Sequence, residues 1–198
     1  MSNQITVGVL SLQGSVAEHM HMLSEIEGVT PLEVKTLESL NKADGVILPG
    51  GESTTISKLL RIFGLLDPLK ERILRGMPVW GTCAGMILLA KEIIGEEPHL
   101  GVMDITVRRN AYGTQLDSFT TNAVIPEISE KEIPLVFIRA PWIEDVGGDA
   151  NVLCRVQGHI VAARQENMLV TSFHPELTED LAVHRYFVGM IKEESLSH

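Results

Sequence analysis

The chain has 198 residues, enough for one well-buried domain and short for two, so we expect a single domain over residues 1–198. Its formal net charge of -10, from 26 acidic and 16 basic side chains, disfavours nucleic acid as a partner because its phosphates would be repelled. No apolar run approaches the roughly 20 residues that cross a bilayer, and residues 1–4 lack the basic region of a secretory signal, so we expect a cytoplasmic protein that binds no membrane.

The first 95 residues alternate short apolar strands with amphipathic helices. In the first helical stretch, apolar residues from Val16 to Ile26 recur at helical spacing, and His19 and His21 indicate only a partly exposed helix. Such alternation predicts a parallel sheet with right-handed crossovers. The predicted strands are 5–10, 32–35, 45–48 and 77–80, and the predicted helices are 16–26, one capped by Ser53 or Thr54, 68–76 and 84–94.

From Gly101 onward the pattern changes to strand-like segments separated by turns, which indicates an antiparallel excursion and a return to the main sheet. We therefore expect a three-layer α/β fold, flavodoxin-like, with a mostly parallel central sheet flanked by helices. Two cysteines are too few for a disulfide framework and fit a reducing compartment, and we interpret Cys154 as a buried strand residue. The segments are 102–108, 118–125, 135–139, 152–156, 160–163 and 169–173, followed by a helix at about 179–193.

Residues 81–85, with the sequence GTCAG, are typical of a nucleophile elbow. They stand between an apolar strand and a helical run, so Cys83 is expected at a tight strand-to-helix turn. The flanking glycines suit a turn that has no room for a Cβ atom. The helix beginning near Ala84 directs its N-terminal amides at the sulfur, a field that favours thiolate over thiol.

His174 and Glu176 follow the strand-like segment 169–173, at the sheet edge where active sites of open α/β folds lie. Cys83 follows its own strand and is expected at the same edge. Glu176 is well placed to orient the imidazole through Nδ1 while Nε2 faces the sulfur, which gives a nucleophile, a base and an orienting acid. A metal site is disfavoured, because no third ligand stands at a recognisable spacing and there is no HExxH.

Residues 48–53 form a glycine-containing loop between a strand and a helix. The loop is neither a GxGxxG motif nor a P-loop, which disfavours a nucleotide ligand. We predict an oxyanion hole made by the amides of Gly51 and Ala84. Because paired glycines let the peptide between them rotate at low cost, we expect that this site is switchable.

The motifs PGGES, GTCAG and SFHPE together resemble the triad-type class I glutamine amidotransferases. More narrowly, the chain is similar along nearly its whole length to the glutaminase subunits of pyridoxal 5'-phosphate synthase, the PdxT family. The segments that carry this resemblance are 11–14, 49–55, 81–85, 108–110, 137–141 and 172–178.

The resemblance implies hydrolysis of L-glutamine to glutamate and ammonia without a cofactor, with the ammonia passing through a tunnel in a partner synthase subunit. It assigns Cys83, His174 and Glu176 as the catalytic triad, and Gln13 and the first helix as contacts to the synthase. It places around the glutamine Gly51, Glu52, Ser53, Arg109, Ile138 and Arg139. By charge, Glu52 suits the substrate ammonium, and Arg109 or Arg139 its carboxylate.

Two features depart from this family pattern, at 111–113 and at Trp142, and both are expected near the pocket rim. Two other functions stay open. The chain could serve as the glutaminase of a different synthase, or it could be a non-glutaminase cysteine hydrolase or silent binding module of similar fold. Stress-type hydrolases often have a histidine directly after the cysteine, where this chain has Ala84.

Overall fold

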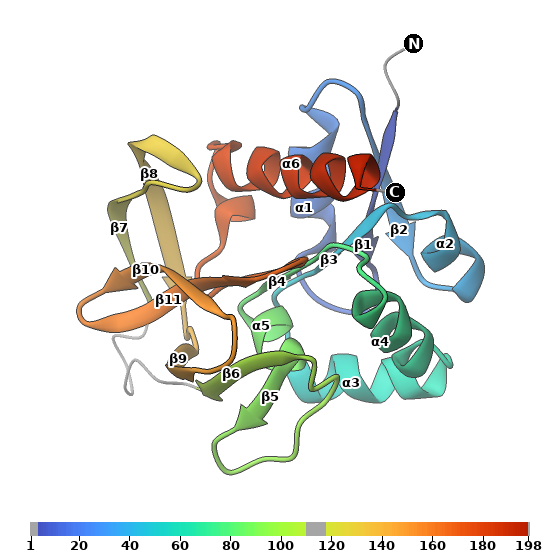
Figure 1. The fold of residues 1–198 in the computed structure, drawn as a ribbon, viewed down its shortest axis with the longest axis horizontal. Helices are drawn as coiled ribbons and strands as arrows, with labels where there is room; N and C mark the ends of the chain where they lie inside the picture. Colours follow the sequence, from blue (N-terminus) through green and yellow to red (C-terminus); the bar gives the residue numbers. More distant parts are fainter. Residues whose placement is uncertain (1–3, 110–117, 198) are drawn as a thin grey trace.

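A mixed ten-stranded sheet forms the centre of the computed structural model, which describes residues 4–109 and 118–197. One half of the sheet is parallel and comprises β1 (Ile5–Leu10), β2 (Val29–Val34), β3 (Gly45–Leu48), β4 (Val79–Thr82) and β12 (Met168–Thr171). The other half comprises β5 (Ala90–Ile93), β6 (Met103–Arg108), β9 (Trp142–Val146), β10 (Asn151–Val156) and β11 (His159–Gln165). The strand order is β2-β1-β3-β4-β12-β11-β9-β6-β5, with β10 paired to β11 (Figure 1).

Helices cover both faces of this sheet. In Figure 1, α1 (Val16–Ser24) and α6 (Ala182–Leu196) lie above it, and α3 (Ser53–Ile62), α4 (Leu66–Leu74) and α5 (Ala84–Leu89) lie below it. The short helix α2 (Leu37–Lys42) packs beside β2. Strands β7 (Ser118–Ile125) and β8 (Ser129–Ile138) form a separate antiparallel hairpin, and the 3-10 turn η1 (Pro175–Leu177) precedes α6.

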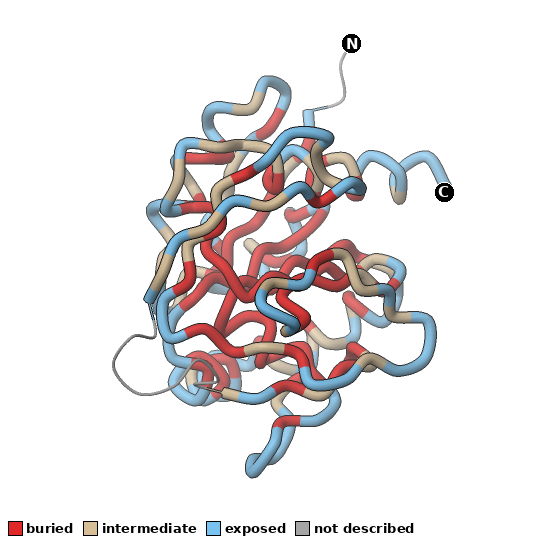
Figure 2. Tube along the Cα trace, turned by 90° about the vertical axis from the view of Figure 1, so that its left-hand side faces the viewer, coloured by how far each residue is buried: buried red, intermediate tan, exposed pale blue. Residues whose placement is uncertain are grey.

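The central strands are buried on both faces, and successive side chains join two different apolar clusters. In β3, Val46 and Leu48 pack toward α3, α4 and α5, whereas Ile47 packs toward α1 and α6. Val79 and Trp80 of β4 divide in the same way. This is the two-residue periodicity of a strand between two helical layers. Figure 2 shows the resulting buried segments running through the middle of the molecule.

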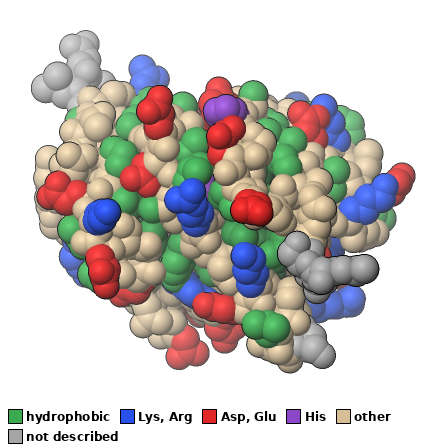
Figure 3. All heavy atoms as spheres, turned by 90° about the horizontal axis from the view of Figure 1, so that it is seen from above, with side chains coloured by type: hydrophobic (Ala, Val, Ile, Leu, Met, Phe, Trp, Pro, Cys, Tyr) green, Lys and Arg blue, Asp and Glu red, His purple; other side chains and the backbone are tan. Residues whose placement is uncertain are grey.

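The surface differs in character from this interior. On the side seen from above Figure 1, acidic and basic side chains are interspersed, with small apolar areas between them (Figure 3). Within the described residues, no helix is both long enough and apolar enough to cross a membrane.

The predicted three-layer architecture, with its antiparallel excursion, is confirmed. The helix predicted at 84–94 is wrong beyond Leu89, because residues 90–93 pair in parallel with β6 as strand β5. Strand β9 was not predicted, because its Glu144 and Asp145 interrupt the apolar pattern of a strand.

Several predicted boundaries were also wrong. Helix α3 begins at Ser53, and neither Ser53 nor Thr54 caps it, since the N-cap residue is Glu52 with no side-chain bond. Helix α6 begins at Ala182 rather than near 179, because Asp180 accepts a hydrogen bond from the amide of Ala182. Local sequence patterns mark such ends poorly.

Candidate functional site

Cys83 occupies the sharp turn between β4 and α5, with φ +51° and ψ −104°. A positive φ is unfavourable for a residue with a Cβ, so the surrounding structure must impose it. A Cβ added to Gly81 would overlap the backbone of Gly85, and one added to Gly85 would overlap the carbonyl of Leu48. The glycines of the motif are therefore required by close backbone packing.

The parallel pairing of β4 with β12 brings Cys83 and His174 to one edge of the sheet. Thr82 and Thr171 are register partners at the carboxyl ends of these strands, and the amide of Cys83 donates to the carbonyl of Thr171 at 2.8 Å. His174 follows three residues later, and its amide donates to the carbonyl of Val136 in β8 at 2.8 Å. The proximity of the two side chains thus results from strand register, since they lie far apart in the sequence.

Glu176 lies behind the imidazole of His174 and is 5% exposed. Its Oε1 is 2.6 Å from His174 Nδ1, and the same oxygen accepts a hydrogen bond from Ser15 Oγ at 3.0 Å. A charge-assisted bond of this length fixes the ring orientation and leaves Nε2 directed away from the acid.

The two groups perturb each other's protonation. Burial alone would lower the pKa of His174, but its hydrogen bonds to Cys83 and Glu176 outweigh burial and raise the pKa to about 10. Burial alone would raise the pKa of Glu176, yet the bond from His174 and the nearby imidazoles lower it to about 2. At neutral pH the site therefore holds an imidazolium beside the sulfur and a carboxylate behind it.

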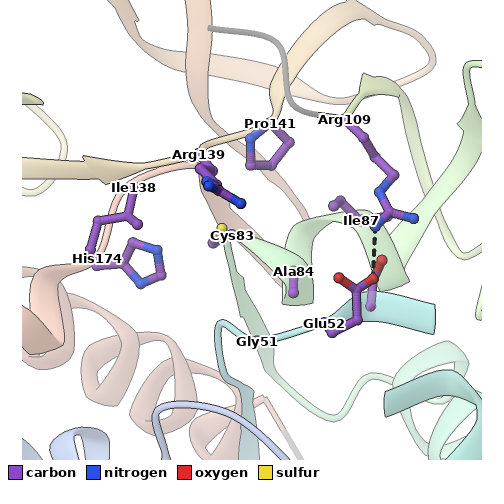
Figure 4. Close-up of a pocket in the computed structure, with 11 residues that line it drawn as sticks. Gly51, Glu52, Cys83, Ala84, Ile87, Arg109, Ile138, Arg139, Pro141 and His174 are labelled. Atoms are coloured by element: carbon purple, nitrogen blue, oxygen red, sulfur yellow. Dashed lines mark hydrogen bonds and ion pairs between the residues drawn. The ribbon is translucent and has the colours of Figure 1, made fainter. Parts of the chain in front are cut away.

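A pocket of about 390 Å³ opens in front of the cysteine. Figure 4 shows His174 to one side of Cys83 and the ion pair of Glu52 with Arg109 to the other. Of the residues predicted for the triad, the oxyanion hole and the glutamine site, all except Glu176 line this pocket. The lining comprises Gly51, Glu52, Ser53, Cys83, Ala84, Ile87, Arg109, Ile138, Arg139, Pro141 and His174.

The charged groups of the pocket differ in their partners. Arg109 donates to Glu52 at 2.7 Å and to both oxygens of Glu96 at 2.7 and 3.0 Å, so this cluster carries a net negative charge. Arg139 makes no hydrogen bond or ion pair that involves its guanidinium among the described residues, and its backbone has φ +43°. A strained backbone and a free cation at a pocket wall are typical of a binding position.

The loop that contains Gly50 and Gly51 packs against residues 13–15. The carbonyl of Gly50 accepts from the amide of Ser15 at 3.0 Å, and Gln13 Oε1 accepts from the amide of Glu52 at 2.8 Å. A Cβ on Gly50 would lie 2.5 Å from the His174 ring. Because N–H and C=O point in opposite directions in a trans peptide, the Gly51 amide is directed away from Ser15.

Several residues at this site were not predicted from the sequence. Ile87 was detectable, since it lies one turn beyond Ala84 on the same helix. Ser15 gave no signal, because its contact with Glu176 spans 161 positions. Helix α1 is partly exposed, as predicted, but the sequence did not indicate that the side chain of His19 is fully buried.

The two departures from the family pattern have different outcomes. Residues 111–113 lie outside the described part of the chain. Trp142 begins β9 and stacks on His159, with ring centroids 3.7 Å apart, so it does not line the pocket.

Comparison with known proteins gives consistent matches. The SNO glutamine amidotransferase family model matches residues 9–193. A Ruminiclostridium cellulolyticum protein named pyridoxal 5'-phosphate synthase subunit PdxT is 57% identical over 186 residues, covering 93% of this chain and 98% of that protein. A Clostridium botulinum protein of the same name is 58% identical, covering 93% and 96%. A crystal structure of a glutamine amidotransferase has a TM-score of 0.88 at 44% identity, covering 94% of this chain and 98% of that one.

The steric requirement at the elbow is testable by adding one methyl group. Gly85→Ala is expected to destabilise the fold by about 3 kcal/mol, because the backbone of Leu48 cannot move without disturbing β3. Urea unfolding followed by circular dichroism measures the change. Gly189→Ala is the matched control, since its Cβ meets no atom within 4 Å inside α6, and a gain of about 0.5–1 kcal/mol is expected. Equal stability of the two variants would contradict this account of the turn.

Proposed function

The chain belongs to the SNO glutamine amidotransferase family, and on that premise we propose that it is the glutaminase subunit of a pyridoxal 5'-phosphate synthase. The observation that carries the catalytic part is the arrangement of Cys83, His174 and Glu176, in which the sulfur faces a pocket and the acid lies behind the base. The reaction is hydrolysis of the carboxamide of L-glutamine to glutamate and ammonia, and the whole chain acts as one glutaminase domain.

In the first half-reaction, the sulfur of Cys83 attacks the carboxamide carbon and forms a C–S bond. The oxyanion that develops is stabilised by the amides of Gly51 and Ala84, both of which line the pocket. The C–N bond then breaks as His174 gives its proton to the departing nitrogen, which leaves as ammonia. A γ-glutamyl thioester remains on the enzyme.

In the second half-reaction, His174 takes a proton from a water molecule, whose oxygen attacks the thioester carbon. The C–S bond breaks, glutamate leaves, and the sulfur and the imidazolium return to their starting states. Glu176 stays ionised throughout, since its pKa of about 2 lies far below neutral pH, and it stabilises the imidazolium each time that it forms.

The charges around the pocket support one orientation of the substrate. The cluster of Glu52, Glu96 and Arg109 is net negative and suits the ammonium group, whereas Arg139 suits the carboxylate. The buried hydroxyl of Ser53 has no hydrogen-bond partner in the described structure and is available to a polar group of the substrate. Ile138 contributes apolar contact beside the chain of the glutamine.

The partner follows from the relatives, which are named as subunits of pyridoxal 5'-phosphate synthase. In our proposal the ammonia passes to the synthase subunit of that complex. Identities of 57% and 58% over nearly full length favour this synthase over another one. The assembled nucleophile, base and acid disfavour a silent binding module. Because Cys83 must be reduced to react, the proposal also includes a cytoplasmic location.

The nucleophile is tested by Cys83→Ala, with Cys154→Ala as the control because Cys154 is a buried strand residue outside the pocket. Cys83→Ala is expected to lower ammonia release from glutamine by at least about a thousandfold. Cys154→Ala should keep its turnover within about twofold. Both are measured with synthase subunit present, by an assay coupled to glutamate dehydrogenase. Substantial glutaminase activity in folded Cys83→Ala would refute the assignment.

The coupling of His174 to Glu176 is tested by Glu176→Gln. Burial lowers the pKa of His174, and the carboxylate charge of Glu176 opposes this effect. Without that charge the pKa should fall from about 10 toward or below its usual 6.5. The His174 ring would then lose its charge, and the stability that depends on that charge, at lower pH. NMR titration of the ring Cε1 proton measures the midpoint. Glu179→Gln, an exposed position three residues on, should leave it unchanged. An unchanged midpoint in Glu176→Gln would contradict the pairing.

The oxyanion peptide is expected to depend on the partner. In the isolated chain a hydrogen bond from the amide of Ser15 holds the carbonyl of Gly50. Paired glycines allow this peptide to turn, and a turned peptide would no longer direct the Gly51 amide at the oxyanion. Loss of one oxyanion donor costs roughly a hundred- to a thousandfold in rate. Purified synthase subunit should therefore raise kcat by at least about tenfold. Steady-state kinetics with and without the synthase decide this, and equal turnover would exclude activation through this peptide.

A further inference from the structure

Two fully buried histidines stand behind the proposed triad acid. His19 comes from α1 and His184 from α6, and both are 0% exposed. His19 Nδ1 lies 2.9 Å from His184 Nε2. On its other side, His19 Nε2 lies 3.3 Å from Thr82 Oγ1 and 3.6 Å from Glu176 Oε2. The proposed mechanism uses neither imidazole.

Both rings are neutral at physiological pH. Burial lowers the pKa of His19 to about 4 and that of His184 to about 3, and the charge of Glu176 opposes this only in part. The other charged groups acting on His19 are His174, which lowers the pKa further, and Glu18, which raises it. Each ring therefore carries one N–H, and the question is which nitrogen holds it.

The two rings share one hydrogen bond of 2.9 Å, so one ring donates its N–H and the other accepts. If His19 donated from Nδ1, its Nε2 lone pair would face the carboxylate, and the N–H of His184 would lie on Nδ1, which has no hydrogen-bond partner. A buried N–H without an acceptor destabilises the folded state. If His184 donates from Nε2, His19 carries its proton on Nε2, facing Glu176. The second arrangement is electrostatically favoured.

We propose that His19 is a positioning residue for Glu176, and that His184 holds it in the tautomer whose Nε2–H faces Oε2 of the carboxylate. This inference rests on the proposed function, because it names the groups that hold the triad acid in place. The acid then has a donor group facing each oxygen: Ser15 and His174 bond to Oε1, and His19 faces Oε2. A neutral dipole holds the carboxylate without neutralising the charge that His174 needs.

The packing around the two rings fixes their planes. Trp80 of β4 meets both edge-on, with centroid distances of 5.4 Å to His19 and 4.8 Å to His184. Thr82, which contacts His19, directly precedes the nucleophile. The imidazole of His19 thus contacts both the residue next to Cys83 and the acid behind His174. It therefore helps to position the two ends of the triad relative to each other.

The tautomer is read directly by long-range ¹H–¹⁵N NMR of the full chain labelled with ¹⁵N-histidine, without substrate. The expected pattern for His19 is a protonated Nε2 and an unprotonated Nδ1, assigned by loss of signals in His19→Gln. A proton on Nδ1, or on both nitrogens, at pH 7 would overturn the inference. Because no turnover is needed, this result stands apart from the proposed function, which fails separately if the native chain with its synthase does not hydrolyse glutamine.

Kinetics of two His184 variants test the positioning role. His184→Leu removes the donor at similar size and should lower kcat by about tenfold with KM changed less than about twofold. His184→Gln offers a side-chain N–H to His19 and should recover most of the rate. Lys192→Gln, at an exposed position of α6, is the matched control and should leave kcat unchanged. Wild-type kcat in folded His184→Leu, or an equal loss of kcat in the Leu and Gln variants, would show that His184 contributes only packing and would contradict the positioning role.

Discussion

The site depends on the close approach of three backbone segments at the carboxyl edge of the sheet. The turn that holds Cys83 lies so near β3 that a single methyl group on Gly85 has no room, and the amide of Cys83 is bonded to β12. That packing imposes a positive φ on a cysteine, a conformation that the residue avoids when free. The strain lifts the sulfur out of the sheet and toward the pocket, where it meets an imidazole delivered by the neighbouring strand.

Burial of ionised groups is expensive, and the way in which this protein meets the cost organises the rest of the site. Glu176 is almost fully buried, yet its pKa is low, because donor groups from a loop, a helix and its own turn surround the carboxylate. His174 can stay protonated only beside such a charge. The acid–base pair is therefore stable as a unit, while neutral imidazoles occupy the deeper layer, where a further charge would not be tolerated.

The opposite wall of the pocket follows a different principle. Glu52, Glu96 and Arg109 neutralise one another in part and are more exposed, so solvent screens their attraction and each contributes little to stability. Such a cluster can exchange one of its own partners for a substrate ion at small cost. Rigidity near the sulfur and exchangeable charges at the rim suit a site that must hold its reacting atoms firmly and still admit and release an amino acid.

The alternation of apolar runs along the sequence predicted most strands and helices of the first half, although not α2, and the short motifs around Cys83 and His174 indicated the chemistry. Such patterns are local, so one chain can report them. The sequence offered no reliable account of β5 or β9, because their side chains contradict strand periodicity and only pairing with β6 and β11 defines them. It also could not reveal that Ser15 and His19 meet Glu176, since contacts spanning more than 150 positions arise only when α1 is packed against the sheet. Residue types and short-range spacing thus belong to the sequence, whereas protonation, burial and partner choice depend on distances that folding alone creates.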